Sequence, residues 1–452
     1  MKPIATGEEM RDIDANAPVP GAVLIRRAGW AVAQAAKRML GGTYGRRVAV
    51  IAGKGNNGAD GRVAAELLSR RGALVRVQSA DEVDVVDPCD LIIDAAYGTG
   101  FKGLYEAPDP GQAAVLAVDI PSGVHCDTGE AAEAAVRADR TITFAALKPG
   151  LLFGAGEERS GRVDLVDIGL DASLASAHLV EQHDVLVRLG APQRSSHKWK
   201  TAVAVIAGSP GMMGSGVLAC RGAQRSGSGM VLWGAPGLFA TATAVGEAVG
   251  FELPNDDWAS DALAASERVK AAVVGPGLGR DPKTVGAIRQ FVASAKIPLV
   301  VDADGLNALT PDVLSVLRKR TAPTVLTPHD GEFARLTGSA PSALRMNDVR
   351  ALARETNCVV LLKGSTTCVA QPNGQVLVSN TGGPRLATAG AGDVLCGIIA
   401  AFLASGLEAE WAAAAGAYIH GAAGQLGFDR GLMAGDLPDL VAKWFELSEK
   451  RS

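Results

Sequence analysis

The chain has 452 residues and a formal net charge of −4, and 48% of its residues are hydrophobic. This length favours two or three domains, and the charge argues against nucleic-acid binding, which needs a basic face. The six cysteines form no C-x-x-C pair, no uncharged apolar run reaches about eighteen residues, and the N-terminus does not resemble a signal peptide. These features indicate no zinc site, disulfide framework or membrane span, and they predict a cytoplasmic protein.

The first part of the chain alternates helix-like and strand-like segments. Residues 22–40 carry apolar side chains at helical spacing, residues 46–53 are typical of a buried strand, and residues 61–72 of a second helix. Such alternation predicts a parallel sheet that is covered on both faces. Further short apolar runs, each an expected strand, occupy residues 73–78, 89–98, 114–123, 140–147 and 161–170.

Residues 171–200 show no clear period and are polar at their end, so we place a domain boundary there. We predict one domain over residues 1–180 and a second over residues 181–452. The alternation restarts with an expected strand at 201–209 and an expected helix at 216–229. Strands that end in loops rich in Gly, Asp, Thr and His follow at residues 269–279, 297–309, 322–333 and 358–371.

The stretch from Thr388 to Phe402 (TAGAGDVLCGIIAAF) is a glycine-rich loop that runs into a helix. Gly390 and Gly392 open this helix, so several backbone N–H groups are expected to face outward and to form, with the helix dipole, an anion site suited to phosphate. Asp393 then lies in the first turn. It is either a charge that steadies the helix by about 0.3–1 kcal/mol, or a base that takes a proton from an attacking hydroxyl.

Other polar groups follow neighbouring strands of the same predicted sheet. In open α/β sheets ligands bind at the carboxyl ends of the strands, so we expect these groups to meet at one edge. A lysine followed by hydroxyls suits a phosphate or a ribose, and a glycine loop allows the backbone to approach a ligand closely. The groups are Lys363 to Thr367, then His329, Asp330 and Glu332, then Asp302 and Asp304, and the glycine loop 275–279.

These motifs, in this order, resemble the ribokinase-like superfamily and, within it, the ADP-dependent NAD(P)H-hydrate dehydratases. The resemblance runs from about Ser196 to the C-terminus and rests on HKWK, GSPGMMGSG, GPGLG, DADGLN, TPHDGE, LKGSTT and GAGD. It implies that hydrated NAD(P)H loses water while ADP, bound with Mg²⁺, is converted to AMP and phosphate. It further implies Asp393 as the base, a hydrate pocket of Ser215, Gly277, Gly279, His329 and Asp393, and a nucleotide site of Lys363, Gly364, Ser365, Thr366, Thr367 and Gly392.

Two residues depart from the usual motifs of that family. Asp330 stands where proline is usual, and Ser215 stands where alanine is common. The first change can alter the rigidity of its loop. Neither touches the implied base. Because sugar and hydroxymethylpyrimidine kinases share the GAGD loop, the alternative is a ribokinase-like small-molecule kinase fused to a dinucleotide-binding module.

The stretch from Gly53 to Gly61 (GKGNNGADG) follows the first buried strand and matches the G-x-G-x-x-G spacing of a dinucleotide-binding turn. A Rossmann site for NAD also needs an acid about 20 residues on, at the end of the next strand, where this sequence has Gln and Ser instead. Asn56, Asn57 and Asp60 are extra to that motif, although such residues are common in loops. Nearby strand ends offer further oxygens of the kind that a hard cation prefers, from Asp94, Asp119 and Ser122.

The motifs GNNGADG, DAAYGTG and DIPSG, in this order, resemble the NAD(P)H-hydrate epimerase family over residues 4–170. The resemblance implies interconversion of the R and S hydrates at carbon six of the nicotinamide ring. It places the catalytic Asp119 near that ring and implies a K⁺ ion shared by Asn57, Asp94 and Ser122. The implied hydrate-binding residues are Asn56, Asn57, Gly58, Ala59, Asp60, Gly98, Thr99, Gly100, Phe101, Lys102, Gly103, Leu104 and Asp119.

The sequence therefore predicts an α/β protein with an N-terminal Rossmann-like three-layer domain and a C-terminal ribokinase-like α/β domain. The epimerase would supply the one epimer that the dehydratase accepts, so the two domains would form one metabolite repair enzyme. We expect this enzyme to be a homo-oligomer. A non-enzymatic nucleotide sensor would be expected to have broken sites, yet Asn57, Asp119 and Asp393 are all in place.

Overall fold

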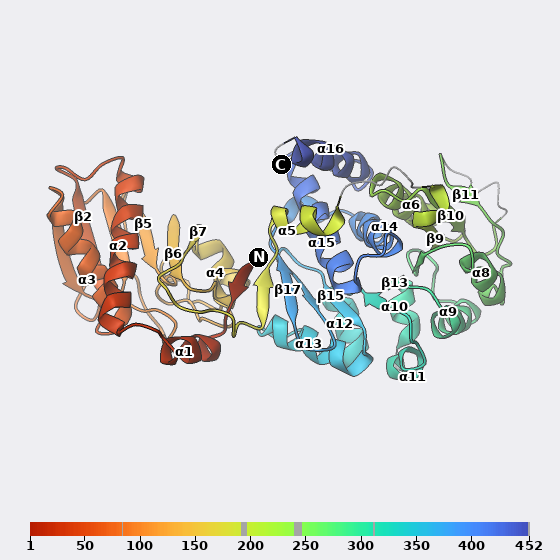
Figure 1. Ribbon diagram of the computed structural model, residues 1–452, viewed down its shortest axis with the longest axis horizontal. Coiled ribbons are helices and arrows are strands. Elements are labelled where there is room, and N and C mark those ends of the chain that lie inside the picture. The colour runs from red at the N-terminus through yellow and green to blue at the C-terminus, as the bar shows by residue number, and fades with distance from the viewer. Residues whose placement is uncertain (84, 191–196, 239–245, 311, 451–452) are drawn as a thin grey trace. The chain divides into compact units, whose positions relative to one another are not determined.

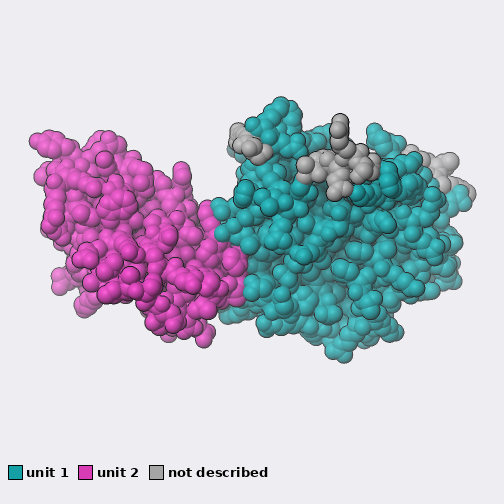
Figure 2. Space-filling model, in the orientation of Figure 1, with its two compact units in different colours: residues 1, 179–452 teal, residues 2–178 magenta. Residues whose placement is uncertain are grey.

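The computed structural model describes residues 1–83, 85–190, 197–238, 246–310 and 312–450 (Figure 1). The chain forms two compact units, which Figure 2 colours separately. We call residues 2–178 the N-terminal unit and residues 179–452, together with Met1, the C-terminal unit. Within the described residues, no helix has both the length and the apolar character needed to cross a lipid bilayer.

The N-terminal unit is built on a parallel sheet of six described strands in the order β3-β2-β4-β5-β6-β7. Helices α2 and α3 cover one face, where the small alanines of α2 allow it to pack closely on apolar strand residues. The strands are β2 (Arg47–Ala52), β3 (Leu74–Ser79), β4 (Leu91–Ala95), β5 (Ala114–Val118), β6 (Arg140–Phe144) and β7 (Arg162–Val166), with the short β1 (Lys2–Ile4). The short strand β8 (Ala177–Leu179) contains the last two residues of this unit and the first residue of the next. The helices are α1 (Gly7–Ala15), α2 (Gly21–Leu40), α3 (Asn56–Ser69), α4 (Gly154–Arg159) and the 3₁₀ turn η1 (Pro149–Leu151).

Helix α3 begins earlier than the sequence pattern indicates. Its first residue is Asn56 and Gly55 is its N-cap, whereas the apolar spacing predicts a start at Gly61. The apolar pattern misses the first turn because Asn56, Asn57 and Gly58 are not apolar. The consequence is functional, because both asparagines lie on the first turn of a helix rather than in a free loop.

The C-terminal unit has a larger sheet in the order β17-β16-β15-β14-β13-β12-β9-β10-β11. The strands from β15 to β11 pair in parallel, and β15, β16 and β17 pair antiparallel. The strands are β9 (Ala202–Ile206), β10 (Met230–Gly234), β11 (Val249–Gly250), β12 (Ala271–Val274), β13 (Leu299–Val301), β14 (Thr324–Leu326), β15 (Val359–Leu362), β16 (Thr367–Ala370) and β17 (Val376–Ser379).

Helices cover both faces of this sheet (Figure 1). Helices α6, α14 and α15 pack on one face and enclose the main core, while α8, α9 and α13 lie on the other. The α/β fold class is thereby confirmed. The helices are α5 (Gln182–Leu189), α6 (Met213–Arg225), α8 (Ala259–Ser266), α9 (Pro282–Ser294), α10 (Asp304–Leu309), α11 (Val313–Leu317), α12 (Asp330–Thr337), α13 (Arg345–Thr356), α14 (Ala391–Ala404), α15 (Ala409–Gln425) and α16 (Leu437–Glu449), with 3₁₀ turns η2 (Lys198–Thr201) and η3 (Pro384–Leu386).

Helices α6 and α14 cross at two glycines. A Cβ on Gly397 would lie 2.0 Å from the carbonyl oxygen of Ala219, and a Cβ on Gly222 would lie 2.4 Å from that of Val394. Only glycine allows this approach of the two backbones. Ser215 in the first turn of α6 hydrogen-bonds to Asp393 in the first turn of α14.

Candidate active sites

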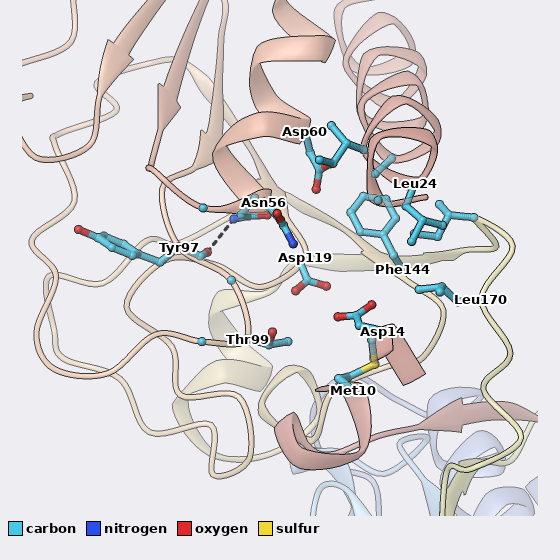
Figure 3. Close-up of a pocket in the computed structure, with 18 of the residues that line it drawn as sticks. Met10, Asp14, Leu24, Asn56, Asp60, Tyr97, Thr99, Asp119, Phe144 and Leu170 are labelled. Carbon is cyan, nitrogen blue, oxygen red and sulfur yellow. Dashed lines mark hydrogen bonds between the residues drawn. The ribbon is translucent and has the colours of Figure 1, made fainter. Parts of the chain in front are cut away.

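A cavity of about 790 Å³ opens at the carboxyl ends of strands β2, β4, β5 and β6 in the N-terminal unit (Figure 3). One wall is apolar and includes Met10, Leu24, Phe144 and Leu170. The carboxylates of Asp14, Asp60 and Asp119 point into the same space in Figure 3. An apolar wall opposite a few convergent polar groups is typical of a small-molecule site.

The loop after β2 contains two glycines at positions where a side chain would not fit. A Cβ on Gly53 would lie 1.9 Å from the carbonyl oxygen of Ala96, and a Cβ on Gly58 would lie 1.9 Å from that of Gly53. The loop is therefore folded tightly against the end of β4 and against itself. This places Asn56 and Asn57 at the cavity.

Asn57, Asp94 and Ser122 form an oxygen-rich cluster, in which Asp94 and Ser122 are buried and the side chains of Asn57 and Ser122 both donate to the carbonyl of Tyr97. The Oγ of Ser122 donates to Asp94 Oδ1 over 2.6 Å, and the backbone N–H of Ser122 donates to Asp94 Oδ2 over 2.8 Å. Burial raises the pKa of Asp94 to about 6, although its hydrogen bonds with Ser122 oppose this rise.

The amide of Asn57 leaves one oxygen of this cluster unmatched. Its Nδ2 donates to the carbonyl of Tyr97 over 2.8 Å, while its Oδ1 is buried and has no hydrogen-bond partner. A buried polar atom without a partner is costly unless a ligand or ion satisfies it. The donor set of amide, carboxylate and hydroxyl oxygens fits a monovalent or other hard cation.

Asp119 and Lys148 form an ion pair in the cavity. Lys148 Nζ lies 2.5 Å from Asp119 Oδ1 and also donates to Thr143 Oγ1 over 2.9 Å. The Lys148 side chain is only 1% exposed, so its charge depends on the carboxylate for compensation. Asp119 has a φ of +68°, a left-handed conformation that non-glycine residues rarely adopt and that commonly marks a functional position.

The cavity also contains a carboxyl group whose pKa is raised. Burial raises the pKa of Asp60 to about 8, and the nearby negative charge of Asp119 adds to this effect. A protonated carboxylic acid can donate a hydrogen bond to a ligand.

Most sequence-predicted binding residues of this unit lie along the cavity, and some do not. Those that line it are Asn56, Asn57, Asp60, Gly98, Thr99, Gly100, Phe101 and Asp119, whereas Gly58, Ala59, Lys102, Gly103 and Leu104 are not among the lining residues. Sequence reasoning missed Lys148 and Asp14, because each is a single residue outside a motif. The position of Lys148, shortly after a predicted strand end, was the only sequence signal available for it.

In the C-terminal unit, Asp393 lies in the first turn of α14, as the sequence predicts. Its N-cap Gly390 has a φ of +91°, and a Cβ there would lie 2.3 Å from Leu218 Cδ1. The amides of Ala391 and Asp393 donate inside this turn, to Thr388 and Gly390. These two amides are therefore not available to an anion.

Ser215, Gly277 and Asp393 come together although they are far apart in the chain. Ser215 hydrogen-bonds to Asp393, and a Cβ on Gly277 would lie 3.0 Å from the Cβ of Ser215. Burial raises the pKa of Asp393 to about 6, against the effect of the Ser215 hydrogen bond and with a contribution from Asp302. Asp393 is therefore mostly ionised at neutral pH, and its raised pKa makes it a better proton acceptor than an ordinary aspartate.

Lys363 lies between two buried acids at neighbouring strand ends. Its Nζ is 2.8 Å from Asp302 Oδ1 and 3.5 Å from Glu332 Oε2. Burial alone would lower the pKa of Lys363, but the charges of the two acids outweigh burial and raise it. A Cβ on Gly392 would lie 3.5 Å from Lys363 Nζ, so the start of α14 faces this cation. The second oxygen of Asp302 accepts from the Cys396 thiol over 3.1 Å, a contact that the sequence did not suggest.

His329 lies at the N-cap of α12, where its Nδ1 accepts from the amide of Gly331 over 3.0 Å. The backbone amide of His329 in turn donates to Glu332 Oε2 over 2.9 Å, which fixes the turn. Gly279 donates to Asp304 over 2.9 Å. In the described residues, no group of three or more His, Cys, Asp and Glu side chains is arranged to hold a metal ion.

The C-terminal unit has a ribokinase-like α/β fold. It is similar in fold to a ribokinase-like superfamily protein from Enterococcus faecalis, with a TM-score of 0.54 and 20% identity over 60% of this chain and 96% of that one. It is also similar to the ADP/ATP-dependent NAD(P)H-hydrate dehydratase of Bacillus subtilis, co-crystallised with ATP and Mg²⁺. That match has a TM-score of 0.50 and 27% identity over 59% of this chain and 97% of that one.

Family models match both units. The NAD(P)H-hydrate dehydratase model matches residues 203–446, and the model of the YjeF-related protein N-terminus matches residues 21–87 and 77–150. The bifunctional NAD(P)H-hydrate repair enzyme Nnr of Moorella thermoacetica is 36% identical over 97% of this chain and 96% of its own length. Its counterpart from Mycobacterium tuberculosis is 38% identical over 88% of each. The chain belongs to the family of bifunctional NAD(P)H-hydrate repair enzymes.

Proposed function

We propose that this protein repairs hydrated NAD(P)H in two steps. The N-terminal unit interconverts the R and S hydrates, and the C-terminal unit dehydrates the S form to NAD(P)H while ADP is converted to AMP and phosphate. The observation that carries this proposal is the full-length match to bifunctional repair enzymes in a chain whose two units both keep a buried, charged site.

In the C-terminal unit, Asp393 is the base of the reaction. It takes the proton of the hydroxyl on carbon six as that oxygen attacks the β-phosphorus of ADP and AMP leaves. The lone pair of the ring nitrogen then expels phosphate, and loss of a proton from carbon five restores the double bond. The original hydroxyl oxygen leaves in the phosphate, so the atoms balance without release of free hydroxide.

The remaining residues of this site hold charge and position the ligands. Lys363 and the start of α14 at Gly392 face the phosphates, where a cation and a helix N-terminus stabilise negative charge. Mg²⁺ bound with ADP would neutralise further phosphate charge. The proposed nucleotide site is Lys363 to Thr367 with Gly392, and the proposed hydrate pocket is Ser215, Gly277, Gly279, His329 and Asp393.

In the N-terminal unit, Asp119 and Lys148 form the proton-handling pair. The pair protonates the hydroxyl on carbon six as the ring nitrogen expels it as water, and water then adds to the opposite face and returns its proton to the pair. Burial raises the pKa of Asp60 to about 8, and in its protonated form this residue would donate a hydrogen bond to the bound hydrate. Homo-oligomer formation and a cytoplasmic location stay predictions from the sequence.

The experiment that tests this function uses a mixture of R and S NADH hydrates with ADP and Mg²⁺. We expect complete recovery of NADH absorbance with one AMP formed per NADH. Recovery that stops at the S fraction would refute the epimerase assignment. No recovery, with phosphate transfer from ATP to an alcohol, would favour the kinase alternative.

A K⁺ ion at Asn57, Asp94 and Ser122 would satisfy the unpartnered Asn57 Oδ1 and hold the loop after β4 in place. We therefore expect Asn57→Ala to raise the K⁺ concentration that half-maximal epimerisation needs by about tenfold or more. The measurement is the epimerisation rate against K⁺ at constant ionic strength. Asn16→Ala, which alters an exposed asparagine on the same unit, is the matched control. An unchanged K⁺ dependence in Asn57→Ala would exclude Asn57 as an ion ligand.

A further inference from the structure

Asp330, which stands where the family usually has proline, forms a two-point ion pair. Its Oδ1 accepts from Arg345 Nη2 over 2.8 Å, and its Oδ2 accepts from Arg345 Nη1 over 3.1 Å. Asp330 is the first residue of α12 and Arg345 is the first residue of α13. A proline would suit the first position of a helix equally well, but it could not bind the guanidinium.

Arg345 also contacts the loop after β15. Its Nη2 donates to the backbone carbonyl of Lys363 over 3.2 Å, and a Cβ on Gly364 would lie 3.4 Å from the same nitrogen. The Arg345 side chain is 19% exposed, so it is largely packed into this position. One guanidinium therefore touches both the residue that follows His329 and the first two residues of the loop from Lys363 to Thr367.

We propose that Arg345 is a positioning residue that connects the loop from Lys363 to Thr367 with the turn at His329 and Asp330. Asp330 holds the Arg345 guanidinium in place. The inference rests on the proposed function, because that function assigns ADP to the loop from Lys363 and the hydrate to the pocket at His329. When the guanidinium is removed, both loops lose a common support. The affinities for ADP and for the hydrate then fall together, while the reacting groups themselves are untouched.

The test compares Arg345→Gln, Asp330→Asn and the double variant with the wild-type full chain. The Kd of Mg²⁺·ADP is measured by calorimetric titration, which needs no turnover, and the KM of the S hydrate and kcat are measured by NADH absorbance. Arg350→Gln is the matched control, because Arg350 is on the same helix and also donates to a backbone carbonyl, that of Gly374 between β16 and β17. Asp330→Glu tests rescue by a conservative change.

We expect each single variant to raise the Kd of ADP and the KM of the hydrate by about fivefold, with kcat within about twofold. The double variant should be no worse than either single one, because both changes break one link. Asp330→Glu and Arg350→Gln should stay within about twofold of the wild type in both affinities. An effect confined to one ligand, or an Arg345→Gln effect no larger than that of Arg350→Gln, would overturn the proposal. Failure of the proposed function can be distinguished from failure of this proposal. If the proposed function is wrong, the wild type shows no hydrate turnover, whereas the ADP titration can still be interpreted.

Discussion

Asp393→Asn is expected to lower kcat for ADP-dependent dehydration by about 10²- to 10⁴-fold, the usual contribution of a general base. Asparagine has nearly the same shape and can still hydrogen-bond to Ser215, but it cannot accept the proton of the attacking hydroxyl. The measurement is recovery of NADH absorbance from the S hydrate together with AMP formation. Epimerisation by the same chain should be unchanged, because Asp393 lies in the other compact unit.

The pH dependence gives this prediction a second readout. Because Asp393 acts as a carboxylate and its pKa is about 6, dehydration should fall as the pH drops through about 6 and level off above it. The Ser215 hydrogen bond holds this pKa down, so Ser215→Ala should move the acid limb of the profile to higher pH. Dehydration that persists in Asp393→Asn, or an acid limb that stays in place in Ser215→Ala, would contradict the role of Asp393 as base.

Local sequence patterns were sufficient to predict those parts of the sites that are continuous in the chain. The glycine-opened helix with Asp393 in its first turn is an example, because glycine spacing, an apolar helix and an early acid all lie within fifteen residues of sequence. The β2 strand and its glycine turn were predictable for the same reason. The exact start of α3 was not, because Asn56 and Asn57 are poor helix signals and no side-chain cap marks the helix start.

For side chains that are far apart in the sequence, only their general proximity could be predicted, and not which of them pair. The ends of parallel strands meet at one edge of the sheet, so the sequence predicted that Lys363, Asp302 and Glu332 lie in one region. It did not predict that the lysine lies between the two acids. Lys148 shows the same limit more sharply. Nothing in its neighbouring residues indicates that its ammonium is buried against Asp119, since this depends on how β5 and β6 pair and on the left-handed backbone at Asp119.

Asp119→Asn is expected to lower the rate of epimerisation by about 10²- to 10⁴-fold and to leave dehydration of the S hydrate intact. The amide cannot exchange the proton that leaves with the hydroxyl and returns with water. It also leaves the buried Lys148 ammonium without its compensating charge, so the N-terminal unit should unfold at a lower temperature. The rate is measured with the purified R hydrate, by its conversion to the S form in the absence of ADP.

Loss of the charge partner must be separated from loss of the proton carrier. Lys148→Met removes the buried cation and fits an apolar chain in the same space, so it should restore much of the stability of Asp119→Asn when the two changes are combined, without restoring epimerisation. If the double variant regains epimerisation, Asp119 serves only to neutralise Lys148. If Asp119→Asn instead stops S-hydrate dehydration in a chain whose C-terminal unit still binds ADP, the assignment of the two reactions to two separate sites is wrong.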